Sequence, residues 1–283
     1  MAKRKDEEMS FLDHLEELRW RLIRSVLAIF VGAIVAFIFK DLIFSQVILA
    51  PRTPDFWTNR IFCELGQYLG SPSLCINRIP LEIISVKMAG QFNMHILVSL
   101  VIGLIIAFPY VFYEFWSFIA PALKSKERKY ANGAIFFSSS LFLLGITFGY
   151  FMIVPLTVHF LGSYSVSPDV NNTINLISYV STITSVVFAS GVVFELPVII
   201  YFLTKIGLVT PEFLKKYRKH SIVVIMILAA IITPPDVFSL VLVSIPLLVL
   251  YEVSIGISKR ITRQRKKQEA QESSSEQLTS SVK

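Results

Sequence analysis

Long apolar runs separated by clusters of basic residues constrain this sequence more than any other feature. About 20 consecutive apolar residues in a helix span the hydrocarbon core of a bilayer. Only 17% of the 283 residues are charged, whereas a soluble domain carries roughly a quarter. We therefore predict an all-α integral membrane protein with six transmembrane helices. The predicted spans are Leu22–Phe39, Phe92–Phe112, Ala134–Leu156, Tyr179–Leu203, Ser221–Thr233 and Phe238–Ile257.

The fifth run is short for a transmembrane helix. At 1.5 Å per residue, Ser221–Thr233 extends only ~20 Å, against a core of roughly 30 Å. The turn that follows, Thr233-Pro234-Pro235-Asp236, cannot continue a helix, so the run could also be a re-entrant segment. Basic residues before the fifth run and after the sixth favour a short fifth crossing, which a thinned bilayer would accommodate. These residues are Lys215, Lys216, Arg218 and Lys219 on one side and Lys259, Arg260 and Arg263 on the other.

The distribution of basic residues predicts the orientation, because cytoplasmic loops carry an excess of Lys and Arg. Six of these residues lie in the N-terminal segment, four and five follow the second and fourth spans, and seven lie in the tail. That is 22 of 27; the other five lie in the long loop after the first span, and such loops cross the membrane regardless of charge. We therefore expect both termini to be cytoplasmic. The first span is also too long for the apolar region of a cleaved signal peptide.

Three regions follow from this topology. Residues 1–21 form a cytoplasmic segment with helical amphipathic spacing, residues 22–257 form the membrane domain with an extended periplasmic loop at 40–91, and residues 258–283 form a tail. The tail is rich in Gln, Glu and Ser and lacks aromatic residues, so we expect it to be disordered. The net charge of +7 does not indicate nucleic-acid binding, because the basic residues flank the apolar runs.

The only two cysteines, Cys63 and Cys75, both lie in the long loop. On an oxidising side of the membrane they could form a disulfide; the alternative is two free thiols too far apart to join. Four scattered His and two Cys have no metal-ligand spacing, so the sequence predicts neither a metal site nor a cofactor.

Glu195 is an anomaly, because it lies inside the fourth predicted span, ~6 Å from the midpoint near Gly191. Ionisable residues at such depth are candidates for function, here a proton relay or a polar docking point for another helix. The structural alternative is a protonated carboxyl group that bonds to backbone freed by Pro197.

Acidic residues within the basic cytoplasmic segments also need an explanation. Glu17 could pair with Arg21 at i, i+4 on the N-terminal helix. Glu127 lies amid four basic residues and could simply balance them. In the third span, Gly145 and Gly149 have the spacing of close helix packing, either within the chain or between chains.

Four motifs, in this order and at matching topological positions, give the chain a resemblance to the TatC family, the receptor subunit of the twin-arginine protein translocase. The resemblance extends from about His14 to Ile257. The motifs are His14-Leu-Glu-Glu-Leu-Arg19, Trp116-x-Phe118-x-x-Pro121-x-Leu123-x-x-x-Glu127-Arg128, Phe194-Glu195-Leu-Pro197 and Thr233-Pro-Pro-Asp236-Val-Phe-Ser239.

The resemblance implies a cupped bundle in the cell inner membrane, with Glu17 and Glu127 on the cytoplasmic rim as receptors for the paired arginines of a folded cargo's signal peptide. Arg19 and Phe118 match positions that shape this site. The pairing is chemically sound, because a guanidinium presents a planar fork of donors to a carboxylate and an ammonium group does not.

The resemblance also implies partners. Glu195 would belong to a polar site for single-span subunits of the TatA/TatB type, in a self-associating complex driven by the proton-motive force. The periplasmic turn would comprise Pro234, Pro235 and Asp236. The long first loop, which includes Arg52–Ser85, exceeds the usual family length, so its local structure cannot be inferred from the family.

Two other functions are less consistent with the sequence. A proton-coupled transporter of small solutes could centre on Glu195, but the chain has no internal repeat and no second charged residue deep in another span. An intramembrane enzyme would need a catalytic motif, and neither HExxH nor GxSxG occurs.

Overall fold

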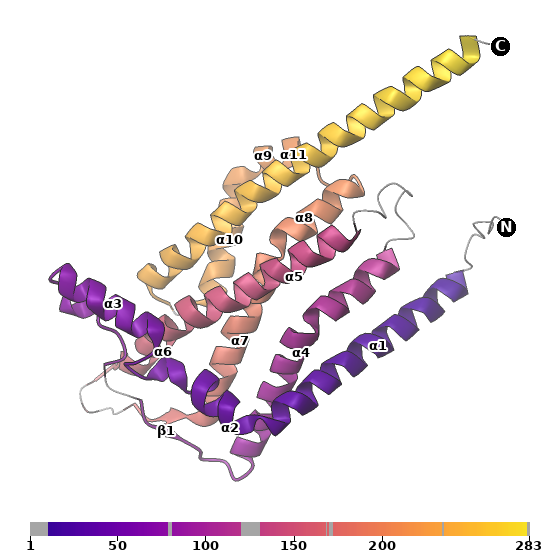
Figure 1. Ribbon diagram of the computed structural model, residues 1–283. Coiled ribbons are helices and arrows are strands. Elements are labelled where there is room, and N and C mark those ends of the chain that lie inside the picture. The colour runs from indigo at the N-terminus through magenta and orange to yellow at the C-terminus, as the bar shows by residue number, and fades with distance from the viewer. Residues whose placement is uncertain are drawn as a thin grey trace. The chain divides into compact units, whose positions relative to one another are not determined.

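The structure, a computed structural model, describes residues 11–78, 81–119, 131–167, 169, 172–233 and 235–281. These residues are mostly helical, and a single two-stranded sheet pairs β1 (Ile83–Ile84) with β2 (Ile174–Asn175) (Figure 1). The chain divides into two compact units. Unit 1 comprises Met1–Ala50, Ile83–Leu143 and Asn175–Thr184, and unit 2 comprises Pro51–Glu82, Leu144–Ile174 and Ser185–Lys283.

Among the described residues, five helical segments are long and apolar enough to cross a membrane. They coincide with five of the six spans expected from the sequence. The remaining expected span corresponds to α10 (Arg218–Ile232), whose 15 residues extend about 22 Å, so the sixth crossing stays a prediction. The five segments are Leu15–Ile38, Gly90–Phe118, Ile135–Ser163, Leu176–Lys205 and Val237–Lys267.

The closest packing in unit 1 joins α1 and α4, which lie side by side (Figure 1). The two backbones meet at Gly32 and Gly103, where a Cβ atom on Gly103 would lie 2.5 Å from the main-chain nitrogen of Ala33. Small residues permit such an approach between membrane helices. The elements of this unit are α1 (Phe11–Ile38), α2 (Lys40–Leu42), η1 (Ile43–Ile48), α4 (Gly90–Ile119), most of α5 (Ala131–Phe148) and the start of α7 (Leu176–Phe194).

In unit 2 the long first loop is folded around two buried amides. The side-chain nitrogen of Asn59 donates to the carbonyl of Thr53 at 2.7 Å, and that of Asn77 donates to Asn59 Oδ1 at 3.3 Å. The structure joins Cys63 and Cys75 by a disulfide, which ties helix α3 to the segment after it. The loop elements are η2 (Ala50–Arg52), α3 (Trp57–Tyr68) and η3 (Pro72–Leu74).

Two glycines of the third predicted span pack within the chain. A Cβ atom on Gly145 would lie 2.7 Å from the carbonyl oxygen of Ser190, and one on Gly149 would lie 2.8 Å from the side chain of Ser190. The spacing of these glycines therefore marks an intramolecular contact with α7. The span itself comprises α5, the π-helical turn η6 (Gly149–Ile153) and α6 (Val154–Ser163).

The short helix α10 is attached to its neighbours by polar contacts. Tyr251 of α11 (Val237–Ser281) accepts a hydrogen bond from the Ser221 hydroxyl at 2.8 Å and donates to the carbonyl of Leu214 at 2.8 Å. Arg218 and Glu252 form an ion pair at 2.5 Å. These contacts hold α9 (Pro211–Lys216) and the first turn of α10 against α11.

The C-terminal segment differs from the expected disorder. Helix α11 continues through residues 258–281, and Thr204 donates to Ser258 at 3.0 Å. The segment after Gly256 contains no Pro or Gly and many Lys, Arg, Gln and Glu residues, which have high helix propensity. The composition that argues against a packed core therefore does not argue against continuation of a helix.

We expect Gly103→Ala to destabilise the protein, because the added methyl group clashes with backbone atoms of α1 that cannot move independently. Overpacking of this kind costs about 1–3 kcal/mol. Gly256→Ala is the matched control, since nothing lies within 4 Å of a Cβ atom at that position. Thermal unfolding in detergent should show a lower Tm for Gly103→Ala only, and an equal Tm for both variants would contradict the close crossing.

Candidate functional site

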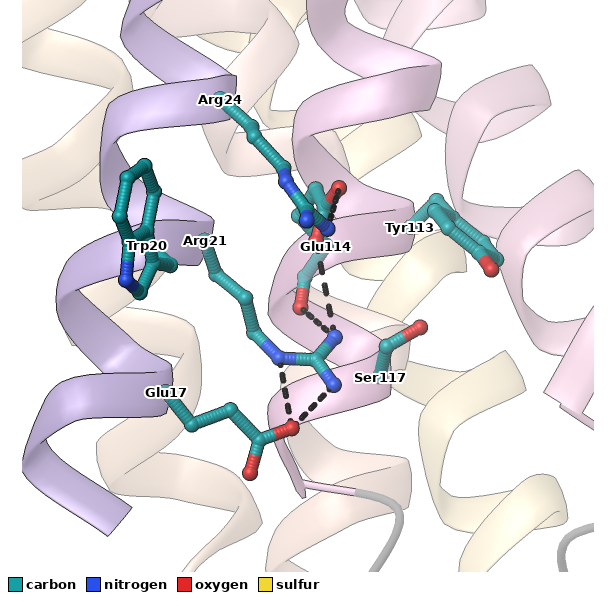
Figure 2. Close-up of a pocket in the computed structure, with 7 residues that line it drawn as sticks. All are labelled: Glu17, Trp20, Arg21, Arg24, Tyr113, Glu114 and Ser117. Carbon is teal, nitrogen blue, oxygen red and sulfur yellow. Dashed lines mark hydrogen bonds and ion pairs between the residues drawn. The ribbon is translucent and has the colours of Figure 1, made fainter. Parts of the chain in front are cut away.

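An open groove of about 590 Å³ lies on unit 1 between α1 and α4, near the N-terminal end of the first apolar helix. Figure 2 shows side chains from α1 directed toward those of α4 across the groove. Charged and aromatic groups dominate its lining, although both helices are mainly apolar. The lining residues are Glu17, Trp20, Arg21, Arg24, Tyr113, Glu114 and Ser117.

Within the groove, Arg21 pairs with Glu17 one helical turn before it. The guanidinium donates from Nε to Glu17 Oε1 at 3.1 Å and from Nη2 to the same oxygen. The i, i+4 pairing expected from the sequence is therefore confirmed. The side chains are 20% and 27% exposed, respectively, so the pair is accessible from solvent.

Glu114 is the most buried charged group of the groove, with a side chain only 6% exposed. Its Oε1 accepts a hydrogen bond from the Tyr110 hydroxyl at 2.8 Å and lies 4.0 Å from Arg24 Nη1. Its Oε2 lies 3.5 Å from Arg21 Nη1. Burial of a carboxyl group is costly unless cations or hydrogen-bond donors pair with it, and these three side chains supply such partners.

The sequence does contain a signal for Glu114, which sequence analysis missed. Glu114 is an isolated acid between Tyr113 and Phe115 at the end of an apolar run, and Tyr110 lies one turn before it on the same helix face. The aromatic neighbours suggest only an interfacial belt. Its partners on α1, Arg21 and Arg24, can be identified only from the packing of the two helices.

The groove is suited to binding a cationic ligand. Two carboxylates lie within reach of guanidinium groups, and the exposed rings of Trp20 and Tyr113 form part of the lining, where a cation can approach a ring face. Among the described residues, no group of three or more His, Cys, Asp or Glu side chains could hold a metal ion. The carboxylates, guanidinium groups and rings that line the groove provide recognition by charge and hydrogen bonding.

The other residues predicted for this site differ in how close they lie to the groove. Arg19 is exposed on α1 and does not line the groove. Phe118 is half-buried in the last turn of α4, next to the lining residue Ser117. Glu127 lies outside the described residues, so the structure brings Glu17 together with Glu114 and leaves the expected Glu17–Glu127 pair as a prediction.

Glu195 lies at the point where one helix stops and the next begins. Helix α7 ends at Phe194, α8 (Leu196–Lys205) follows, and the Glu195 residue between them is only 8% exposed. Pro197 is fully buried and has no N–H to continue the ladder of hydrogen bonds, which accounts for the break. The structure therefore places a buried carboxyl group beside interrupted helix backbone.

The turn before α11 has one clear structural role. Asp236 Oδ2 accepts a hydrogen bond from the main-chain nitrogen of Ser239 at 2.7 Å, so Asp236 caps the start of α11. Pro235 is exposed, and Pro234 lies outside the described residues.

Comparisons with known proteins agree over nearly the whole chain. The family described as Sec-independent protein translocase protein (TatC) matches residues 13–246. The TatC protein of Blattabacterium sp. subsp. Periplaneta americana is 42% identical over 93% of this chain and 100% of its own length, and that of Aquifex aeolicus is 35% identical over 91% and 98%. A crystal structure of the twin-arginine translocase receptor TatC in DDM superposes with a TM-score of 0.66 at 35% identity, covering 87% of this chain and 99% of that one.

We expect Tyr110→Phe to lower the Tm, because the buried Glu114 carboxylate loses a hydroxyl donor. Tyr113→Phe is the matched control: both rings are exposed on the same helix, but the hydroxyl that donates to Glu114 Oε1 is that of Tyr110, so the Tyr113 change should stay within about 0.5 kcal/mol. The Tm of each variant in detergent measures the effect. Equal Tm values would show that the hydroxyl does not stabilise Glu114.

Proposed function

The chain belongs to the TatC family of Sec-independent protein translocase proteins, and we propose that it is the membrane receptor that binds twin-arginine signal peptides of folded cargo proteins. Members of this family are components of a protein translocase and not enzymes, so the chain is a multi-pass membrane protein of protein transport. The observation that carries the proposal is the carboxylate of Glu17, which accepts two donors from a guanidinium in an open groove.

The internal contact supports a site for arginine rather than lysine. A guanidinium can direct two N–H groups at one carboxylate, whereas an ammonium group acts as a compact point charge. The first arginine of the peptide takes the place on Glu17, and Glu127 receives the second. Arg19 and Phe118, which flank the groove in sequence, complete this binding region.

A cytoplasmic position of the groove follows from the proposed topology. Six spans, with α10 as the short fifth, place both termini in the cytoplasm and the loop at 40–91 in the periplasm, across the cell inner membrane. The basic residues support this orientation, since 22 of 27 fall on the cytoplasmic side. Residues 1–21 then lead into the membrane domain at 22–257, and residues 258–283 extend from it into the cytoplasm.

A second polar site is proposed at Glu195 for single-span partners of the TatA/TatB type. The burial of its carboxyl group at a helix break supports this role, because a partner helix with a polar side chain could hydrogen-bond there within the bilayer. The complex self-associates and uses the proton-motive force for export. The turn at Pro234, Pro235 and Asp236 forms its periplasmic side.

Glu17→Ala and Glu127→Ala should each abolish capture of a fluorescent twin-arginine peptide by the detergent-solubilised protein, because each removes one acceptor for a guanidinium. Glu16→Ala is the matched control, an exposed acid adjacent to Glu17 that does not line the groove. Fluorescence anisotropy measures the affinity. Normal affinity of the Glu17 and Glu127 variants would overturn the site assignment.

Glu195→Ala should leave peptide affinity near normal and reduce cross-linking to single-span partners in membranes, because only the partner site is lost. Glu195→Gln, which keeps a hydrogen-bonding group of the same size, should retain more cross-linking than the alanine variant. Glu212→Ala, at an exposed position in α9, is the control. If Glu195→Ala instead abolished uptake of a small solute by proteoliposomes, the chain would be a transporter.

A further inference from the structure

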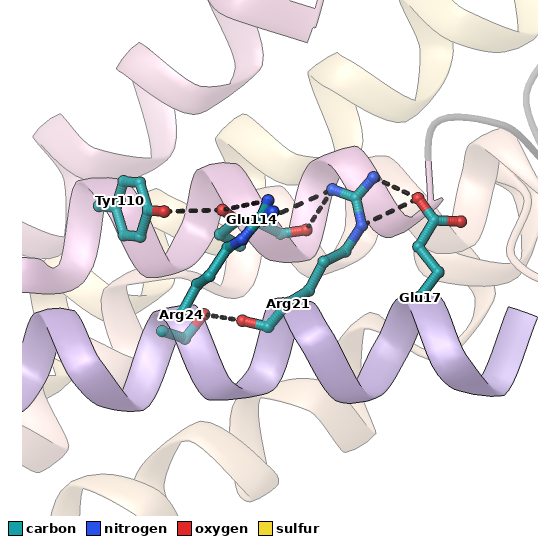
Figure 3. Close-up of polar contacts among 6 residues, drawn as sticks. Glu17, Arg21, Arg24, Tyr110 and Glu114 are labelled. Atoms are coloured by element: carbon teal, nitrogen blue, oxygen red, sulfur yellow. Dashed lines mark hydrogen bonds and ion pairs between the residues drawn. The ribbon is translucent and has the colours of Figure 1, made fainter.

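The guanidinium of Arg21 lies between two carboxylates (Figure 3). On one side its Nε and Nη2 both donate to Glu17 Oε1. On the other side its Nη1 lies 3.5 Å from Glu114 Oε2 and donates to the main-chain oxygen of Glu114 at 3.4 Å. Arg21 therefore occupies Glu17 with a two-donor contact of the kind that a ligand's arginine would make.

The two contacts of Arg21 differ in quality. Charge-assisted N–H···O bonds are about 2.7–2.9 Å long. The contacts from Arg21 to Glu114, at 3.5 Å and 3.4 Å, are longer than this range and longer than the Nε contact to Glu17 at 3.1 Å, so the guanidinium is held mainly by Glu17 and only loosely by Glu114. The distance between Arg21 and Glu114 can shorten when Arg21 no longer binds Glu17.

Glu114 keeps its attraction for Arg21 whatever occupies Glu17. Its carboxylate is nearly buried, and its Oε1 is already fixed by Tyr110 and lies near Arg24, while Oε2 faces Arg21. A buried carboxylate that loses cationic partners becomes costly. Arg24 alone, which is 63% exposed and 4.0 Å away, is a weak replacement for Arg21.

A third guanidinium cannot simply be added to this arrangement. The side chains that line the groove carry two carboxylates and two guanidinium groups, so their charges balance. An arginine that arrives at Glu17 repels Arg21 at short range and competes for the same oxygen. The nearest acceptor to which Arg21 can turn is Glu114.

We propose, on the basis of the proposed function, that Arg21 is an internal competitor for Glu17. Glu114 is the positioning residue that receives the Arg21 guanidinium when a signal-peptide arginine binds Glu17. The groove thus exchanges one guanidinium for another on Glu17, and the displaced one stays paired within the protein.

Affinity measurements on the full chain in detergent test the competitor. Arg21→Gln should bind a twin-arginine peptide roughly two- to fivefold more tightly, the scale of a partly exposed ion pair. It should strengthen binding of the twin-lysine counterpart by the same factor, because a competitor lowers the affinity of every ligand of Glu17 equally. Arg263→Gln, which removes an exposed charge from α11, is the control and should leave the affinity unchanged.

A double-mutant cycle tests the acceptor. Glu114→Gln should weaken peptide binding several-fold in the wild-type chain, because Arg21 then depends on Glu17 alone. The same substitution should have no effect when Arg21 is already Gln. Equal losses in both backgrounds would mean that Glu114 acts on the peptide or on the fold directly, and would overturn its assignment.

The outcomes separate this inference from the proposed function. If the wild-type chain fails to bind the peptide, or if Glu17→Ala leaves binding normal, the proposed function fails and the inference with it. If Glu17 is required but Arg21→Gln leaves the affinity unchanged or lowers it, only the inference is overturned. This criterion stands even if the Glu114 variant does not fold.

Discussion

The close crossing of α1 and α4 determines what the rest of unit 1 can do. Gly32 and Gly103 let the two backbones meet, and a larger residue at either position would push the helices apart. The crossing fixes which side chains face each other toward the helix ends. Arg21 and Arg24 of α1 therefore meet Glu114 of α4. Because these opposite charges pair across the two helices, each helix can carry them in an apolar setting.

Buried carboxyl groups mark the two candidate sites, but they are stabilised in different ways. Glu114 is surrounded by two guanidinium groups and a hydroxyl from two helices, and these contacts offset the cost of its burial. Glu195 lies at a break between α7 and α8, where Pro197 interrupts the backbone ladder. The first arrangement suits exchange of cationic partners, and the second suits a hydrogen bond with another helix.

Sequence alone predicts the features that depend on local pattern. Five spans follow from hydropathy, and the Glu17–Arg21 pair follows from helical spacing. Features that depend on distant residues escape prediction. In the sequence, Glu114 looks like part of an aromatic belt, because its partners lie on α1. The long first loop is stabilised by the buried amide of Asn59 and by contacts with residues far along the chain, such as the bond from Asn77 to the carbonyl of Pro155. The helical tail was not predicted for another reason. Its composition indicates that it forms no packed core, but an existing helix can continue without a packed core.

The charge distribution imposes a condition on any peptide that the groove binds. On the proposed topology the cytoplasmic segments are strongly basic, so their field repels a cationic signal peptide at distances within a Debye length of about 8–10 Å. The balanced charge of the groove's side chains provides no long-range attraction to offset this. Recognition must then rest on short contacts, in which the number and direction of donors matter more than net charge. Under the proposed function, a requirement for arginine, with its fixed fork of donors, follows from this balance, since an ammonium group meets the same repulsion with fewer directed contacts.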